Sequence, residues 1–365
     1  MTSKERVTNT FERKAVDFIP AGVWPWPSTL KKWVSQGHLA QGEDPYEHFA
    51  QDIRCHAGDL NSIADLDYED VIVEETQSTI LKINGNGAKL KFHKLHESAP
   101  EHVDFAVKDR KGWDKFIRDR LIDVDRRRIP FEEYRKDKSL ADKNERYFCW
   151  HGMAPLEQIH PMCGHENMFM AMALDPGWVK EMVMAYASFT IRHLEVLFTE
   201  EGKPDGLWFS EDMGYKGKTF MSAGMYKEIF FPGHKLLFDW VHSKGCKTIV
   251  HSCGYVEPLV PGLIEAGMDC LQGMEAKAGM DLPTLAEKFG DYICFFGGID
   301  VRALATNDRE KIDNELLIKI PPVIKRGCGY ILHCDHSEPP EVDYQTMHYF
   351  IKRGREIAAK EILDK

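Results

Sequence analysis

The feature that most constrains the fold is an alternation of short apolar segments with long amphipathic ones over the C-terminal two-thirds of the chain. The expected strands cover Tyr147–Trp150, Gly206–Ser210, Lys247–His251, Asp269–Gln272, Tyr292–Gly297 and Gly329–Cys334. The expected helices cover Pro176–Thr199, Ser222–Ser243, Val256–Ala266, Asp281–Lys288, Asp308–Lys325 and Asp343–Leu363. A repeating strand–helix unit predicts parallel strands joined by right-handed crossovers.

An earlier apolar segment, Ile19–Trp24, adds a further strand. Together with the strand–helix units it approaches the eight strands of a (β/α)8 (TIM) barrel, which is the α/β fold that we expect. A doubly wound open sheet is the alternative. The sequence contains neither a Gly-x-Gly-x-x-Gly motif nor a Walker-type loop to favour that alternative.

The stretch from Tyr68 to Ala106 has a different pattern. Short β-like runs at Asp70–Glu75, Ser78–Ile83 and Ala88–Lys94 surround the sequence Asn84-Gly85-Asn86-Gly87. Asn-Gly pairs supply the positive φ angles that a tight hairpin turn needs. We therefore expect residues 68–106 to form an antiparallel hairpin inserted early in the barrel, and residues 1–365 to form a single domain.

Charge and cysteine content disfavour several partners and locations. The formal net charge of −11 disfavours nucleic acid and anionic membranes, which both attract basic proteins. No apolar run is long enough to cross a bilayer, and no signal peptide is recognisable. The nine cysteines lack a disulfide-like spacing, so we expect a reducing, cytoplasmic environment.

Metal-ligand residue types stand at the ends of two expected strands. His251 and Cys253 are two positions apart, so on an extended strand they point to the same side. Cys334 ends another apolar run. Because the carboxyl ends of barrel strands meet at one face, we expect one imidazole and two thiols to converge there as a zinc site with an open fourth position. The fourth ligand is left open between His333, His336, Glu211 and water.

Other residues at the predicted strand ends are candidates for catalysis or for substrate contacts. Glu211 and Asp212 follow the strand Gly206–Ser210, and they can serve in catalysis or simply as a loop pair or helix cap. His336 is a third catalytic candidate. We expect the substrate to contact Trp24, Trp26, His151, Tyr215 and Asp300, with Trp150 also at the mouth. The tryptophan pair Trp24 and Trp26 can equally be a hydrophobic plug.

On these residues, the chain resembles the uroporphyrinogen decarboxylase superfamily, whose fold is a β/α barrel. The resemblance covers nearly the whole length. Arg6–Pro20 is similar to the opening helix and first strand of the family, and His251-Ser252-Cys253-Gly254 and Phe296–Asp300 are close to its recurrent motifs. The decarboxylases carry a loop whose arginines hold the carboxylates of the porphyrinogen. The corresponding loop here, Trp24–Leu30, has no arginine, so decarboxylation of that substrate is not expected.

The cobalamin-dependent methyltransferases form another branch of this superfamily. They are similar to this chain in a His-x-Cys motif followed by a distant cysteine. The resemblance implies that His251, Cys253 and Cys334 bind zinc and that the methyl group is exchanged with a corrinoid such as methylcobalamin. The sequence has no Asp-x-His-x-x-Gly corrinoid-binding motif, so the corrinoid is expected on a separate partner protein. The residues around Cys334 differ from the usual sequence of the coenzyme M branch, so the substrate stays open.

These observations predict a zinc-dependent methyltransferase that moves a methyl group from an O-methyl donor to the cobalt of a corrinoid protein. The aromatic mouth favours an aromatic methyl ether, and Glu211, Asp212 or His336 would protonate the departing oxygen. One alternative is a methylcobalamin:thiol or methylcobalamin:tetrahydrofolate methyltransferase that uses the same zinc. Another is a metal-free decarboxylase or binding protein of the same fold. Assembly into a homodimer is also left open.

Overall fold

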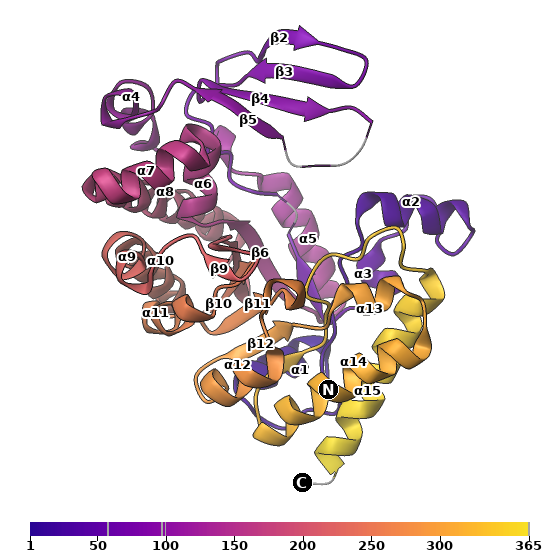
Figure 1. The fold of residues 1–365 in the computed structure, drawn as a ribbon. Helices are drawn as coiled ribbons and strands as arrows, with labels where there is room; N and C mark the ends of the chain where they lie inside the picture. The colour runs from indigo at the N-terminus through magenta and orange to yellow at the C-terminus, as the bar shows by residue number, and fades with distance from the viewer. Residues whose placement is uncertain (57, 96–97, 99, 364–365) are drawn as a thin grey trace.

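The computed structural model describes residues 1–56, 58–95, 98 and 100–363. Its centre is a curled parallel sheet of seven strands in the order β1-β6-β7-β10-β11-β12-β13 (Figure 1). These strands are β1 (Ile53–Cys55), β6 (Tyr147–Met153), β7 (Gly206–Ser210), β10 (Lys247–Ser252), β11 (Cys270–Gly273), β12 (Cys294–Gly297) and β13 (Tyr330–Ile331). The six strands predicted after residue 146 are all present. The short strand β1, with an arginine at its centre, was missed.

The segment predicted as the first strand closes the sheet into a barrel. The Leu332 N–H donates to the Pro20 carbonyl (2.8 Å), and the Gly22 N–H donates to the Leu332 carbonyl (3.0 Å). On the other side, the Asp52 N–H donates to the Ala21 carbonyl (3.2 Å), next to β1. Residues 20–22 therefore occupy the eighth strand position, between β13 and β1, and the fold is the expected β/α barrel.

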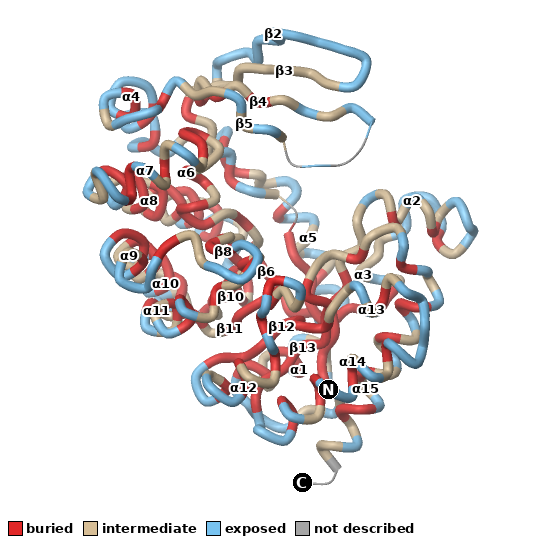
Figure 2. Tube along the Cα trace, in the orientation of Figure 1, coloured by how far each residue is buried: buried red, intermediate tan, exposed pale blue. Residues whose placement is uncertain are grey.

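Helices surround this barrel, and their buried faces turn toward the sheet (Figures 1 and 2). Those that match predicted helices are α8 (Pro176–Glu201), α9 (Ala223–Ile229), α10 (Phe231–Ser243), α11 (Val260–Ala266), α12 (Leu282–Phe289), α14 (Arg309–Arg326) and α15 (Tyr344–Leu363). The predicted helix Ser222–Ser243 is two helices, because Pro232 has no N–H to continue the hydrogen bonding of α9. None of the helices in the described part of the chain has the length and apolarity needed to span a membrane.

The remaining elements are short or lie before β7. The other α-helices are α1 (Ser3–Phe11), α2 (Pro27–Ser35), α3 (Pro45–His48), α4 (Arg110–Phe116), α5 (Phe131–Lys143), α6 (Pro155–Cys163), α7 (His165–Leu174) and α13 (Val301–Ala305). The 3-10 helices are η1 (Arg118–Leu121), η2 (Arg126–Arg128), η3 (Glu257–Leu259) and η4 (Ala276–Ala278). A two-stranded ribbon, β8 (Gly214–Tyr215) and β9 (Lys218–Thr219), follows β7.

Alternating side chains fill the interior of the barrel. The cluster consists of Val7, Phe11, Ile53, Cys55, Tyr147, Cys149, Trp208, Ile249, Cys270, Cys294, Phe296 and Ile331. Members on one strand are two positions apart, which is the period of one face of a strand. The next inward positions toward the carboxyl ends of the strands are polar: His151, Ser210, His251 and Gln272. The apolar plug thus ends where a polar barrel mouth begins.

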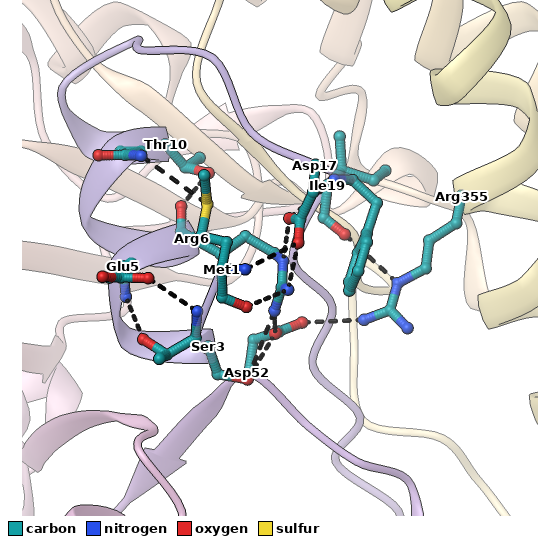
Figure 3. A network of polar contacts seen from close by, with 12 residues as sticks. Met1, Ser3, Glu5, Arg6, Thr10, Asp17, Ile19, Asp52 and Arg355 are labelled. Atoms are coloured by element: carbon teal, nitrogen blue, oxygen red, sulfur yellow. Dashed lines mark hydrogen bonds and ion pairs between the residues drawn. The ribbon is translucent and has the colours of Figure 1, made fainter.

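A buried carboxylate, Asp52, ties the closing segment to the terminal helices α1 and α15 (Figure 3). It accepts hydrogen bonds from the Ala21 N–H (2.9 Å), from Arg6 Nη1 (2.5 Å) and from Arg355 Nη2 (2.9 Å). Its side chain is only 1% exposed. Because a buried charge is stable only when it is paired, this network positions residues 20–22 and both helices against β1.

The insertion between β1 and β6 contains the predicted antiparallel hairpin as part of a four-stranded antiparallel sheet. Its strands, in the order β2-β3-β4-β5, are β2 (Val71–Glu75), β3 (Thr79–Ile83), β4 (Ala88–His93) and β5 (Glu101–Phe105). The predicted turn joins β3 to β4, with Gly87 at a φ of 69°. β5 was missed because only two of its five residues are apolar. Strand β2 is exposed along its whole length, whereas β4 and β5 pack on α6.

Candidate metal centre and substrate cavity

Three possible metal ligands meet beyond the ends of β7 and β10. One ligand atom from each of Asp212, His251 and Cys253 lies within 4.8 Å of the others. Ser210 of β7 is the register partner of His251 on β10, so the residues just beyond them reach the same level of the barrel. The Cys253 N–H donates to Asp212 Oδ1 (2.7 Å), which holds the carboxylate beside the thiol. His251 Nε2 is 3.3 Å from Cys253 Sγ and 3.5 Å from Asp212 Oδ1.

A neighbouring amide orients the histidine for metal binding. His251 and Gln272 are register partners on β10 and β11, and Gln272 Oε1 makes a short hydrogen bond with His251 Nδ1. With the amide oxygen as acceptor, the ring proton sits on Nδ1 and the lone pair of Nε2 faces Cys253 and Asp212. This tautomer is the one that a metal bound at Nε2 requires.

The acidity of Cys253 also fits a metal ligand. Burial raises the pKa of its thiol, and the charges of Asp212 and Glu275 raise that pKa further. The thiol alone is therefore protonated at neutral pH, and a divalent cation would reverse this preference. Of the nine free cysteines, Cys253 is the one that is not fully buried. An imidazole, a thiol and a carboxylate are all zinc ligands, so the residues present fit the metal.

Cys334, the third predicted ligand, is not a member of this group. In the described part of the chain, Asp212 takes the third place beside His251 and Cys253. Cys334 is fully buried, and its thiol lies against the carboxyl group of Glu338, also fully buried. Burial raises the pKa of the Cys334 thiol, and it raises the pKa of Glu338 to about 7. Zinc binding by Cys334 stays a prediction.

A cavity of about 240 Å³ opens beside the metal ligands. Its lining residues are Trp24, His151, Trp208, Ser210, His251, Gln272, His333, His336 and Ser337. The structure therefore brings four predicted site residues, Trp24, His151, His251 and His336, to one cavity. Trp24 and Trp208 form an apolar wall, with ring centroids 4.8 Å apart at 71°. These lining residues include neither lysine nor arginine.

Two of the cavity histidines are uncharged at neutral pH. Burial, together with the nearby His251, lowers the pKa of His151 to about 4. Burial likewise lowers the pKa of His333 to about 4. His151 Nε2 is 3.1 Å from Ser210 Oγ, so these two side chains form one polar group on the cavity wall. At pH 7, His151 and His333 can exchange hydrogen bonds with a ligand but carry no charge.

Glu211, predicted as catalytic, belongs to the core. Its side chain is 1% exposed and pairs with His234 (2.7 Å between Oε1 and Nε2). It also accepts hydrogen bonds from the backbone N–H groups of Leu156 (3.0 Å) and Glu157 (3.3 Å), at the start of α6. A carboxylate at a helix N-terminus stabilises the helix. Glu211 therefore positions α6, and it does not line the cavity.

Asp300, predicted to contact substrate, is a helix cap. It precedes α13, accepts from the Arg302 N–H (2.9 Å) and pairs with the Arg302 guanidinium (2.6 Å). The cavity lining does not include Asp300. Its place at a strand end suggested a substrate contact, but its carboxylate instead caps the N-terminus of α13.

Three aromatic residues predicted at the mouth lie elsewhere. Tyr215 is 48% exposed on β8 and stacks on Phe220. Trp150 is buried in the outer core against Phe209. Trp26 stacks on His336 (6.2 Å between centroids) and thus supports a cavity residue without lining the cavity.

The sequence interpretation missed Trp208, Ser210, Gln272 and Glu338. Trp208 and Ser210 are two positions apart on β7, and Gln272 ends a predicted strand. Because alternate side chains of a strand point to the same face, this spacing could have identified them as residues that point into the barrel. Glu338 had no such signal, because it lies beyond β13. Its Oε2 accepts from the Trp24 N–H (2.8 Å), and its carbonyl accepts from the Trp26 N–H (3.1 Å). Glu338 therefore holds the backbone of Trp24 and Trp26 in place next to the cavity.

Comparison with known proteins relates this barrel to others. The curated proteins yield no match. Among solved structures, the fold is similar to that of a methyltransferase from Methanosarcina mazei, with a TM-score of 0.63 and 12% identity over 98% of this chain and 99% of that chain. The profile described as uroporphyrinogen decarboxylase (URO-D) matches residues 152–357, more than half of the chain. That match covers β7 to β13 and includes the candidate ligands His251 and Cys253, so the chain belongs to the uroporphyrinogen decarboxylase family.

Proposed function

We propose that this chain is a zinc-dependent methyltransferase of a corrinoid-linked system. It would move a methyl group from an aromatic methyl ether to the cobalt of a separate corrinoid protein. The observation that carries this proposal is the convergence of Asp212, His251 and Cys253 beside a cavity walled by Trp24 and Trp208. The likeness in fold to a protein named as a methyltransferase supports the same reaction class.

Zinc would be held by His251, Cys253 and Asp212, with Gln272 fixing the ring of His251. When bound, the metal would supply Lewis-acid polarisation of the donor oxygen. The protein would add orientation, because three side chains from two adjacent strand ends leave little freedom to the ligand set.

The cavity supports a small aromatic donor. A volume of about 240 Å³ lies below the range of about 300–1,000 Å³ typical of drug-sized ligands, so it suits a single substituted ring. Trp24 and Trp208 offer apolar contacts to such a ring. The absence of lysine and arginine from the described lining disfavours a substrate with several carboxylates.

The reaction breaks the methyl–oxygen bond, passes the methyl group to reduced cobalt, and leaves a phenol after the oxygen gains a proton. His151 and His333 are neutral at pH 7, and His251 is assigned to the metal. We assign His336 as the proton donor because it lines the cavity and is held in place by its stacking on Trp26. We assign Asp212 to metal binding, in place of the catalytic role predicted from sequence.

The proposal is tested by an anaerobic assay with a reduced corrinoid protein and a methoxyarene. We expect loss of the reduced-cobalt absorption together with release of the phenol. Cys253→Ala should abolish both signals and should lose one equivalent of zinc, measured by plasma mass spectrometry. Cys246→Ala is the matched control, because this buried cysteine precedes the opposite end of β10. Full activity in Cys253→Ala would contradict the proposal.

Two alternatives give different results in the same assay. A methylcobalamin:thiol or methylcobalamin:tetrahydrofolate methyltransferase uses the same ligands, so it would leave the methoxyarene untouched and methylate a thiol or a pterin. A metal-free decarboxylase or binding protein would bind no zinc at His251 and Cys253, so its zinc content would be the same in Cys253→Ala as in the wild type. The lack of basic lining residues is the observation that disfavours a decarboxylase of polycarboxylates.

A further inference from the structure

Three histidines outside the cavity meet where the inserted sheet joins the barrel. They are His102 on β5, His160 on α6 and His165 on α7, and one ring nitrogen of each lies within 4.8 Å of the others. The rings stack, with centroids of His160 and His165 4.2 Å apart at 18°, and those of His102 and His165 5.5 Å apart at 13°. The cluster therefore has three possible ligands from three elements.

Local geometry explains why two of these histidines approach each other. α6 ends at Cys163, and Gly164 turns the chain into α7 with a φ of 80°. A side chain at Gly164 would be strained at that φ and would also overlap the Phe105 ring of β5. The glycine thus places His160 and His165 on either side of a tight bend and lets β5 pack against it.

The surroundings of the rings resemble those of metal-bound histidines. Nδ1 of His102 and Nδ1 of His160 are buried and have no hydrogen-bond partner in the described structure. The other nitrogen of His160, Nε2, is 3.0 Å from Glu157 Oε2. A carboxylate that accepts the proton of one ring nitrogen leaves the lone pair of the other free for a metal.

We propose that His102, His160 and His165 bind a divalent transition-metal ion, with zinc as the probe, at a second site separate from that of His251 and Cys253. Unpartnered buried nitrogens are unfavourable, and one ion would satisfy those of His102 and His160 together with a nitrogen of His165. Imidazole favours zinc, copper and nickel over magnesium and calcium. Zinc–nitrogen bonds of about 2.0–2.1 Å place ligand nitrogens about 3.4 Å apart. Binding therefore requires the three rings to rotate out of their near-parallel stack, so that their in-plane lone pairs converge on one ion.

The protonation of the rings agrees with this geometry. Burial lowers the pKa of His165 to about 4, and it also lowers the pKa of His102. Both rings are therefore neutral at pH 7, as metal ligands must be. A metal here would join the inserted sheet to α6, the helix whose start is positioned by Glu211.

The test isolates the second site with a His251→Ala/Cys253→Ala variant, which lacks two ligands of the first. After loading with zinc alone and removal of the excess, we expect one equivalent by plasma mass spectrometry. Adding His160→Ala should lower the bound zinc by about tenfold or more. Adding His348→Ala, which removes a histidine of α15 in edge-on contact with Tyr344, should leave the stoichiometry unchanged. Cobalt(II) in the isolated site should show ligand-field bands without thiolate charge transfer.

The proposal is overturned if the His251→Ala/Cys253→Ala variant binds no zinc, or if His160→Ala does not reduce binding. If circular dichroism shows that this variant is unfolded, single variants replace it. Cys253→Ala and His160→Ala should then each remove one of two zinc equivalents from the full protein, and unchanged zinc in His160→Ala overturns the proposal. Methyl transfer does not enter these measurements, so failure of the proposed function leaves them interpretable.

Discussion

The barrel and the inserted sheet differ in how deeply their side chains are buried and in how tightly they are packed. In the barrel, inward side chains are buried layer upon layer, and β1 is held by the buried Asp52 network. In the inserted sheet, β2 is exposed throughout, and ion pairs such as Lys94–Glu75 lie at the surface. Stability and geometric precision therefore reside in the barrel, and the insertion gains position where β4 and β5 meet α6.

This difference shows how each region can contribute to a site. The candidate ligands His251 and Cys253 lie on and just beyond the strand β10, and Gln272 on the adjacent strand holds the ring of His251. The insertion supplies a single histidine, His102, to a cluster whose other members lie on helices. A site on strand ends is preorganised by register, whereas a site at the junction depends on how the sheet docks.

The largest expected effect is a loss of stability when the buried Asp52 network of the barrel is broken. Asp52→Ala leaves Arg6 buried without its most buried partner, so the free energy of unfolding should fall by about 3–5 kcal/mol. Asp17→Ala is the matched control, because Asp17 pairs with the same arginine but is 38% exposed, and it should cost below about 1 kcal/mol. Denaturant unfolding measures both values, and equal losses would contradict the buried network as the source of stability.

A smaller effect concerns the pH dependence of stability near the cavity. The pKa of Glu338 is raised in the folded state to about 7 by burial, so the folded protein binds a proton that the unfolded chain releases above pH 4.5. The stability contribution of neutral Glu338 is therefore lost as pH rises from about 4.5 through 7, by about 3 kcal/mol. Glu338→Gln should remove this slope. The measurement is the free energy of unfolding of the wild type and of Glu338→Gln at several pH values, with a chelator present. If that free energy changes with pH in the same way in both proteins, the prediction is wrong.

The orientation of His251 should matter at the level of metal affinity. Gln272→Ala removes the acceptor of its Nδ1 proton and should weaken metal binding by about 10- to 100-fold. Gln272→Glu keeps an acceptor and should retain the affinity. Cobalt(II) titration followed by thiolate charge transfer reports this site alone, because it contains Cys253. Equal cobalt affinities of the wild type and Gln272→Ala would show that the Gln272 amide has no role in metal binding.

The smallest expected effect lies in the inserted sheet. Lys94→Ala breaks the surface contacts of Lys94 with Glu75 and Thr76, and water replaces them at little cost. We expect a denaturation midpoint that is indistinguishable from that of the wild type. A clear loss of stability would show that the insertion is coupled to the barrel more tightly than its exposure indicates.

The sequence by itself determined the barrel and brought out two of the candidate metal ligands. Short continuous apolar runs located six parallel strands and the closing segment, and period-3.6 patterns located the helices, because burial of a strand or of a helix face leaves a direct record in the order of apolar residues. His251 and Cys253 were predicted because parallel strands end at one face, so their spacing along one strand sufficed. The same logic applied to Trp24, His151 and His336, which line the cavity.

Tertiary structure alone decided how polar groups at equivalent positions are used. Glu211 and Asp212 are adjacent, yet one is buried at the start of α6 and the other faces Cys253. The thiol of Cys334 contacts the carboxyl group of Glu338, and Asp300 caps a helix. The cluster of His102, His160 and His165 joins residues of three elements. Side-chain partners depend on packing between segments that are distant in sequence, and a one-dimensional pattern carries no record of that packing.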